Sequence, residues 1–403
     1  MNARDFSRNG VLSPELLTTF LLFMVADGNR RGIRQLLPDF WVHASDHGLS
    51  LPTEEPVSAS AICQARERLD PEVFRQLLYA LSCTPVDGKP PAHARHWHGR
   101  RVFAADGAKI NLRRSPELEH TFGVPNNAYC PQVLMSALVD VCLRMPVDVE
   151  VSGFRGSERE QLLAMLDSID RGDLLILDRG YPSHEVLQAC SEAGIDFLVR
   201  VPSSHTFKAV DEFRRSGVSE AIATLALPPD SDPEWSPLRV RLTRIEGPDG
   251  PSFYISSLDQ EQISEADIKE LYHMRWEAEE YFKLFTSEYI GQKQFRSTSA
   301  RGVVQEVAAL TLFIAISRLF ADAADAELSD PEESVSQKGA VLTLAKVLTL
   351  ILLDSNPETT KATINRALRR IRMTRDRHRP GRSHPRRSFL PSRKWGPKGR
   401  RRA

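Results

Sequence analysis

The sequence predicts an α/β protein: a mixed sheet flanked by helices, with an N-terminal helical domain and a mainly β insertion. Near the N-terminus, Leu16, Leu17 and Phe20 follow the i, i+3, i+4 spacing of an amphipathic helix. Residues 174–177 are apolar at every position, which is typical of a strand covered on both faces of a sheet. Residues 238–243 alternate apolar and polar side chains, which predicts a half-exposed antiparallel strand in the insertion.

Periodicity and capping signals predict the remaining elements in chain order. Helices are expected at residues 11–40, from Ser58 or Ser60 to Leu69, and at 72–81, 158–169, 183–193, 301–320 and 340–353, with another beginning near Ser264. Strands are expected from Arg101 to Asp106-Gly107, and at 132–143, 147–154, 174–177, 196–201, 238–243 and 252–258.

The composition excludes a mostly disordered chain, because 41% of the 403 residues are hydrophobic and 26% are charged. The 53 basic and 53 acidic residues balance overall, but residues 366–403 contain 16 of the basic residues and one acidic residue, Asp376. The body is therefore acidic and the C-terminal tail strongly basic. This asymmetry predicts a basic arm for nucleic acid, and a solvated tail without a partner is the alternative.

Other sequence features indicate a reducing compartment. The five cysteines are far apart and none has CxxC spacing, so neither a zinc knuckle nor a disulfide framework is expected. The first ten residues lack the layout of a secretory signal, and the apolar stretch 340–353 is too short to span a bilayer. His93, His96 and His98 are expected in an exposed loop. We therefore expect no membrane association and a cytoplasmic location.

Three acidic residues are the candidates for chemistry. Asp106 and Asp178 each follow an apolar strand, and ligands of α/β proteins usually bind at the carboxyl edge of the sheet. Glu279 lies inside the long helix that begins near Ser264. Together the three carboxylates would form a hard-oxygen site for two Mg²⁺ or Mn²⁺ ions, which can activate a water or 3′-hydroxyl in phosphodiester transfer. Taken singly, Asp106 also suits a turn, and Asp178 a helix cap.

The helix around Glu279 places unusual residues within an arc of roughly 100° at 100° per residue. These residues are Tyr272, Arg275, Trp276, Glu279, Lys283 and Thr286. A face that combines aromatic, basic and acidic side chains suits a site for metal and phosphate. The alternative is a ladder of i, i+4 ion pairs beside a partly buried tryptophan.

Several of these segments resemble the insertion-sequence-4 family of DDE transposases. YHMRWEAEEYFKLF, which begins at Tyr272, resembles the family signature, and FAADGAKINL and LLILDRGYPS resemble the contexts of its first and second aspartates. SASAICQARERLDPEVF and the tail segment RPGRSHPRRS also have counterparts in the family. The resemblance covers most of the chain from about residue 10.

The resemblance implies an RNase H-like catalytic core and a DNA transposase that cuts and joins the ends of an insertion sequence. Asp106, Asp178 and Glu279 would be the catalytic metal ligands. The expected DNA contacts are Tyr272, Arg275, Lys283, Trp276 and Arg179. The implied partners are terminal inverted repeats and target DNA, with a homodimer in the synaptic complex of a bacterial cytoplasmic protein that joins the nucleoid when bound.

The expected domain organisation follows the same resemblance. The expected regions are an N-terminal helical end-binding region at 1–95, a catalytic core at 96–201 and 251–322, a β-rich insertion at 202–250, a C-terminal helical region at 323–365 and a disordered basic tail at 366–403.

One residue departs from the family signature. The family signature has a lysine after the glutamate, separated from it by six residues. In this sequence that position is Thr286, and Lys283 on the same helical face is the expected substitute. Related enzymes hold a flipped base with a tryptophan, for which Trp235 and Trp276 both remain candidates. A catalytically degraded DNA-binding derivative and a stand-alone metal-dependent nuclease are the alternative functions.

Overall fold

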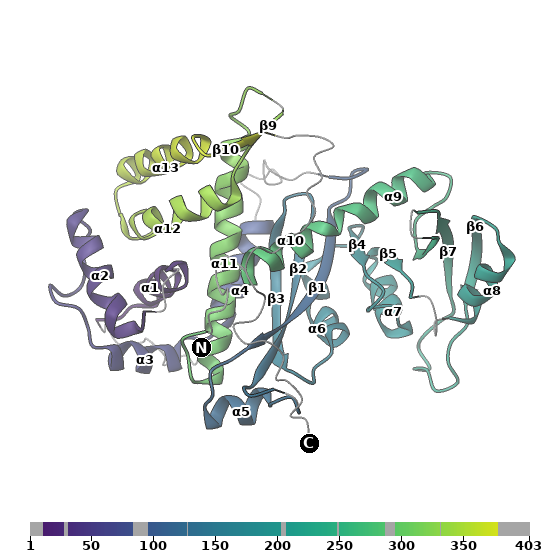
Figure 1. Cartoon of the computed structure of the whole chain (residues 1–403), viewed down its shortest axis with the longest axis horizontal. Coiled ribbons are helices and arrows are strands. Elements are labelled where there is room, and N and C mark those ends of the chain that lie inside the picture. The colour runs from purple at the N-terminus through teal and green to yellow at the C-terminus, as the bar shows by residue number, and fades with distance from the viewer. Residues whose placement is uncertain are drawn as a thin grey trace, which may run out of the picture.

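The computed structural model describes residues 11–27, 31–83, 96–126, 128–202, 207–247, 250–286, 295–330 and 332–377. Eight strands form one sheet in the order β3-β2-β1-β4-β5-β8-β7-β6 (Figure 1). The strands are β1 Val102–Asn111, β2 Gln132–Asp140, β3 Met145–Gly153, β4 Leu174–Leu177, β5 Asp196–Arg200, β6 Glu220–Leu225, β7 Leu238–Ile245 and β8 Ser252–Ser256. A separate pair is formed by β9 Glu333–Val335 and β10 Arg375–Arg377.

Helices precede, flank and follow this sheet. The N-terminal helices are α1 Pro14–Ala26, α2 Ile33–Asp46, α3 Ala59–Arg68 and α4 Glu72–Cys83. Those between the strands are α5 Pro116–Phe122, α6 Glu158–Met165, α7 His184–Ala193 and α8 Lys208–Ser216. The later helices are α9 Glu265–Met274, α10 Trp276–Lys283, α11 Ala300–Asp325, α12 Gln337–Leu353 and α13 Pro357–Arg372.

The strand directions define the fold class. Strands β1, β2 and β3 are antiparallel neighbours, and β4 and β5 run parallel to β1. The remaining strands β8, β7 and β6 continue the sheet as antiparallel neighbours of β5. Three antiparallel strands followed by two parallel ones, with helices on both faces, form the RNase H-like core that the sequence predicted.

Strand β4 lies in the middle of the sheet, as its continuous apolar run predicted. All four of its side chains have no exposed surface. Leu174 and Ile176 pack into the large core on the side of α9, α10 and α11. Leu175 and Leu177 pack into a second core with residues of α6 and α7. Helices therefore cover both faces of this strand, as the prediction required.

Local capping explains where several helices begin. Ser58 caps α3 and Ser183 caps α7, since each hydroxyl accepts a hydrogen bond from a backbone N–H of the first turn. At α9, the Ser264 hydroxyl accepts from the Asp267 N–H at 3.2 Å while Asp267 accepts from the Ser264 N–H at 2.8 Å. This reciprocal capping box fixes the start of the long helix where the sequence predicted it.

The helix predicted over residues 11–40 is two helices. α1 ends at Ala26, where Asp27 has the extended conformation of a cap (φ −69°, ψ 105°). α2 begins after Gly32, whose backbone is also extended (φ −78°, ψ 167°). The Asp-Gly-Asn sequence that begins at Asp27 contains residues that favour turns, and it separates two helical patterns of similar periodicity.

Two expected regions differ from the sequence prediction at their boundaries. The insertion at 202–250 contains α8 besides its strands, and β6 and β7 extend the main sheet. Helix α13 continues to Arg372 and β10 pairs with β9, so residues 366–377 are not a disordered tail. The helix is amphipathic, because Ala367 and Ile371 are buried while Arg366, Arg369 and Arg370 are exposed. Residues 378–403 lie outside the described residues.

Helix α11 runs through the centre of the molecule, between the N-terminal helices and the sheet (Figure 1). It is a longer apolar segment than the predicted 340–353, and its 26 residues have the length and composition of a membrane span. In this structure 67% of its most apolar window is buried inside the protein. The helix therefore acts as the common support of the helical region and the catalytic core.

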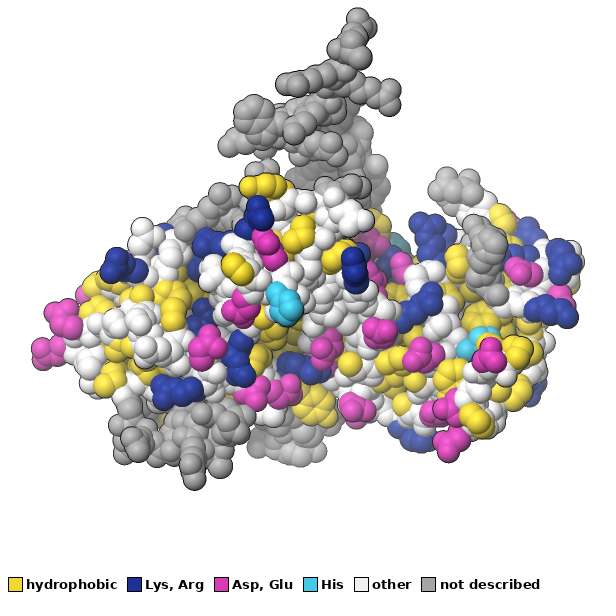
Figure 2. All heavy atoms as spheres, turned by 90° about the horizontal axis from the view of Figure 1, so that it is seen from below, with side chains coloured by type: hydrophobic (Ala, Val, Ile, Leu, Met, Phe, Trp, Pro, Cys, Tyr) yellow, Lys and Arg dark blue, Asp and Glu magenta, His cyan; other side chains and the backbone are white. Residues whose placement is uncertain are grey.

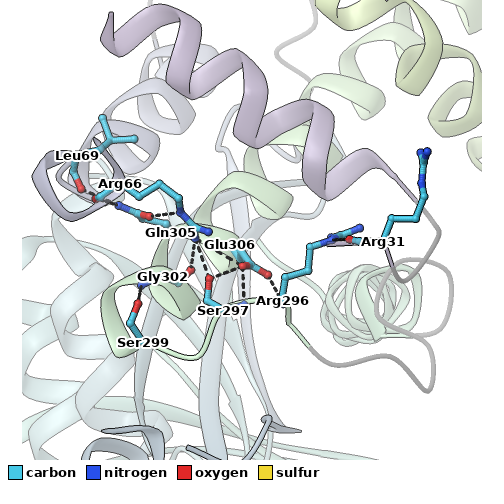
Figure 3. Close-up of polar contacts among 9 residues, drawn as sticks. All are labelled: Arg31, Arg66, Leu69, Arg296, Ser297, Ser299, Gly302, Gln305 and Glu306. Atoms are coloured by element: carbon cyan, nitrogen blue, oxygen red, sulfur yellow. Dashed lines mark hydrogen bonds and ion pairs between the residues drawn. The ribbon is translucent and has the colours of Figure 1, made fainter. Parts of the chain in front are cut away.

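A buried polar network joins the N-terminal helices to α11 (Figure 3). Arg66 of α3 donates to Gln305 at 2.9 Å and to Ser297 at 2.9 Å, and its guanidinium lies 3.5 Å from Glu306. The Glu306 side chain is 1% exposed and also accepts the Arg296 N–H at 2.7 Å. Because Arg296 and Ser297 lie between α10 and α11 in the chain, the network ties the path after α10 to the N-terminal helices.

Charges are mixed on the face of the body drawn in Figure 2. Basic and acidic side chains are interspersed there among apolar ones rather than gathered by sign. The excess of basic over acidic residues lies near the C-terminal end, in α13 and in the sequence after it.

Candidate active site

The register of two parallel strands places the two aspartates. Val102, Phe103 and Ala104 of β1 pair with Leu174, Leu175 and Ile176 of β4. Continued by two residues, the same register sets Asp106 beside Asp178. Strand β4 ends at Leu177 whereas β1 continues to Asn111, so both carboxylates lie where the central strand stops. This is the carboxyl edge at which α/β sheets commonly bind ligands.

Backbone N–H groups orient both aspartates. The Gly107 N–H donates to Asp106 Oδ1 at 2.9 Å, and the Gly180 N–H donates to Asp178 Oδ1 at 2.7 Å. A Cβ atom at Gly180 would lie 3.0 Å from Asp178 Oδ1, so glycine allows this close approach. Each aspartate thus has its Oδ1 held by a backbone N–H, and its Oδ2 accepts no hydrogen bond from the part of the chain that the structure describes.

The two aspartates lie in an electrostatically unfavourable cluster. Burial raises the pKa of Asp106 from 3.8 to about 6, Arg275 opposes the shift, and the charges of Asp178 and Glu158 add to it. Burial, and then the charge of Asp178, also raise the pKa of Glu158. Such carboxylates attract cations, because a bound positive charge removes their mutual repulsion.

Glu279 approaches this cluster from α10, but its side chain pairs with Arg275. Arg275 lies over the ring of Tyr272, with its guanidinium carbon 5.7 Å from the ring centre. Tyr272 in turn packs edge-on against Tyr254, with 4.9 Å between ring centres. Arg275 separates α9 from α10, but its backbone stays helical (φ −54°, ψ −25°), with i to i+3 hydrogen bonds on either side of it.

The residues of the face predicted from helical spacing divide into two interacting sets. Tyr272, Arg275 and Glu279 form one interacting set. Trp276 and Lys283 form another, because the Trp276 Nε1–H donates to Glu280 at 2.9 Å and the Lys283 ammonium lies 3.1 Å from the same carboxylate.

Trp276 lies beside a cavity of about 510 Å³ lined by residues near the β2–β3 turn and α9, including Cys142, Arg144 and His273. Neither predicted aspartate lines it. Trp276 is 42% exposed and Trp235 is partly buried in the loop between β6 and β7. Trp276 belongs to the same helix as Glu279, three residues before it, whereas Trp235 lies in the insertion.

Thr286, at the position of the signature lysine, donates its hydroxyl to the Phe282 carbonyl at 2.6 Å within its own helix. Lys283 is exposed and pairs with Glu280 rather than with any of the three acids. Arg179, next to Asp178, is exposed and forms no ion pair with the residues that the structure describes. Among the expected DNA contacts, Arg179 has the side chain most available for phosphate.

The structure thus brings Asp106 and Asp178 together and directs Glu279 to Arg275. Among the described residues, no three His, Cys, Asp or Glu side chains lie close enough to hold a metal ion in the present arrangement. The oxygen ligands that this site offers suit a hard divalent cation, because Asp106 and Asp178 are neighbouring carboxylates that repel each other.

Sequence reasoning missed Glu158 and Tyr181 at this site. Glu158 is the first residue of α6, and Tyr181 follows the Asp178-Arg179-Gly180 segment. The sequence offered a weak signal for Tyr181 only, as part of the DRGY motif. Glu158 gave no signal, because it is 52 positions from Asp106 in the sequence and comes near it only when α6 packs on the sheet.

Comparison with known proteins identifies the class. Residues 97–316 match the family described as "Transposase DDE domain". This region covers more than half of the chain and contains both aspartates and Glu279. The chain therefore belongs to the transposase DDE domain family, which confirms the resemblance found in the sequence.

Two proteins of Escherichia coli (strain K12) are similar in sequence. "Transposase InsG for insertion sequence element IS4" is 25% identical over 241 residues, which are 57% of this chain and 54% of that protein. "Putative transposase InsZ" is 27% identical over 149 residues, 34% of this chain and 47% of that protein. The chain spans about half the length of these curated relatives.

Among the solved structures that resemble this chain is that of a piggyBac transposase synaptic complex with hairpin DNA. The match has a TM-score of 0.46 and 12% identity, and it covers 94% of this chain and 81% of the other. At this level the likeness carries no argument about function.

Proposed function

We propose that this chain is the transposase of an insertion sequence, which cuts DNA at the ends of its element and joins them to target DNA. The register of β1 and β4 carries the proposal, because it sets Asp106 and Asp178 side by side at the sheet edge near the helix of Glu279. Membership of the transposase DDE domain family supports it.

Asp106, Asp178 and Glu279 would hold two Mg²⁺ or Mn²⁺ ions. Carboxylates are the ligands that these hard cations prefer, and the raised pKa of Asp106 indicates a buried negative charge that a cation would stabilise. When bound, the ions would activate water or a 3′-hydroxyl for attack and stabilise the leaving oxygen.

The side chains around the acids would bind and orient DNA. Glu279 must leave Arg275 to join the two aspartates, and the freed guanidinium can then bind a backbone phosphate through two hydrogen bonds. Tyr272 keeps Arg275 in place by lying under it. Arg179, Lys283 and Trp276 would contact DNA on either side of this position.

The helical region and the basic tail would supply DNA affinity outside the site. The N-terminal helices would bind the element ends, and the Arg66 network would fix them relative to the chain that follows α10. The basic residues beyond α13 would add sequence-independent contacts to phosphate. Two copies of the chain would be needed to hold both ends at once, so we propose a synaptic homodimer.

The test is nicking of a duplex that carries the inverted repeats flanking the coding region, with and without Mg²⁺ or Mn²⁺. We expect metal-dependent nicks at the repeat end, abolished in Asp106→Asn, Asp178→Asn and Glu279→Gln with DNA binding retained. Asp170→Asn, at an exposed aspartate before β4, is the matched control. Binding without any cleavage by the unmutated chain would instead indicate a catalytically silent DNA-binding protein. Cleavage indifferent to the repeats would indicate a nuclease.

A further inference from the structure

The carboxyl group of Glu158 lies directly against the backbone of Gly107, next to Asp106. A Cβ atom at Gly107 would be 2.6 Å from Glu158 Cδ and 2.9 Å from Glu158 Oε1, closer than real atoms approach. Any other residue at position 107 would displace this carboxyl group. Glycine at this position thus allows a glutamate from α6 to reach the end of β4 from the second core.

The position of Glu158 is not explained by its place in the first turn of α6. Acidic residues are common at helix N-termini, where the helix dipole favours their charged form and lowers their pKa. Burial and Asp178 instead raise the pKa of Glu158. Glu160, in the same first turn, is exposed. The carboxyl group of Glu158 therefore packs onto β1 at Gly107, whereas that of Glu160 is exposed to solvent.

The buried hydroxyl of Tyr181 points into the same cluster, where Glu158 is the group it interacts with. Tyr181 is 1% exposed, and its hydroxyl forms no hydrogen bond of normal length with any residue that the structure describes. After burial, the groups that raise its pKa are the carboxylates of Glu158, Asp106 and Asp178, so the hydroxyl faces all three. A buried hydroxyl of this kind usually binds a ligand or an ordered water.

We propose that Glu158 is a fourth carboxylate ligand of the metal site, which it reaches from the α6 side of the sheet while Glu279 reaches it from the α10 side. The Tyr181 hydroxyl would bind a metal-coordinated water or carboxylate oxygen on the same side. This inference rests on the proposed function. It also balances charge, because two divalent ions bring four positive charges and the three predicted ligands bring three negative ones.

The test is Mn²⁺ binding to the full-length protein without DNA, followed by electron paramagnetic resonance of free Mn²⁺. We expect two ions per chain in the unmutated protein and at least a tenfold weaker affinity for one of them in Glu158→Gln. Glu160→Gln, the exposed neighbour in the same turn, should bind like the unmutated protein. Gly107→Ala should reproduce the loss, because its Cβ displaces the Glu158 carboxyl group.

Thermal unfolding in EDTA separates a metal ligand from a structural residue. Glu158→Gln should unfold at the same or a higher temperature than the unmutated protein, since it relieves repulsion among the carboxylates. A lower unfolding temperature together with unchanged Mn²⁺ affinity would show a structural role and overturn the inference. If Glu158→Gln binds Mn²⁺ as tightly as the unmutated protein while Asp106→Asn loses binding, the role of Glu158 is overturned and the proposed function stands. If the unmutated protein binds no Mn²⁺, the proposed function fails as well.

Discussion

Replacement of Asp106 by asparagine should stabilise the protein in the absence of metal. The pKa of this carboxyl group rises from 3.8 to about 6 on folding, mainly through burial. A shift of about two units corresponds to about 3 kcal/mol, since each unit is worth about 1.4 kcal/mol. The folded state binds the proton more tightly, so stability falls as the pH rises from about 4 to about 6 and stays low above it. Asparagine removes this cost and can still accept the Gly107 N–H.

The assay is thermal unfolding in EDTA at several pH values. With an unfolding entropy of roughly 2 cal/mol/K per residue, about 3 kcal/mol raises the unfolding temperature by about 3 to 4 °C. We expect this gain for Asp106→Asn at pH 7.5 and a much smaller one near pH 4, where the native carboxyl group is protonated. Mn²⁺ should then stabilise the unmutated protein but not the variant. An equal or lower unfolding temperature at pH 7.5, or a gain independent of pH, would refute the reasoning.

Three further changes test other parts of the structure. Arg66→Ala should destabilise the fold by about 3 to 5 kcal/mol in urea unfolding, because it leaves the buried Glu306 without its cation, whereas the exposed Glu67→Ala should have little effect. Truncation after Arg377 removes ten basic residues and should flatten the salt dependence of binding to unrelated duplex DNA, and an unchanged slope would exclude the tail as a phosphate-binding arm. Arg179→Ala should weaken binding to an end-containing duplex and lower the salt slope by about one, with no change in unfolding temperature.

The sequence predicted the parts of the fold in which local pattern and tertiary position agree. The run Leu174–Leu177 is apolar throughout because β4 is covered on both faces, so one segment revealed the strand, its central position and the location of Asp178. Ser264 and Asp267 marked the start of α9 for a similarly local reason, since capping depends on four consecutive residues.

Other parts could not be predicted because their cause is not local. Helix α13 lies where basic residues dominated the composition, and its apolar positions, such as Ala367 and Ile371, are few. The face predicted from helical spacing divides into two sets because of ion pairs such as that of Arg275, which spacing alone does not specify. Glu158 carried no signal, because its neighbour Gly107 is distant in the chain and the contact exists only once α6 packs on the sheet.

The arrangement of charge suggests how metal loading and DNA binding are coupled in the proposed transposase. In this structure Arg275 pairs with Glu279 and also stabilises the charge of Asp106, so it serves as an internal counter-ion of the acids. Divalent ions bound by the same carboxylates would compete with the guanidinium and repel it. Arg275, still supported by Tyr272, would then lack an anionic partner at the edge of the site, where the phosphate of a bound DNA strand can supply one. Entry of metal would thereby create the phosphate-binding group that positions the strand to be cut, which gives a role to the placement of Arg275 four residues before Glu279, directly ahead of α10.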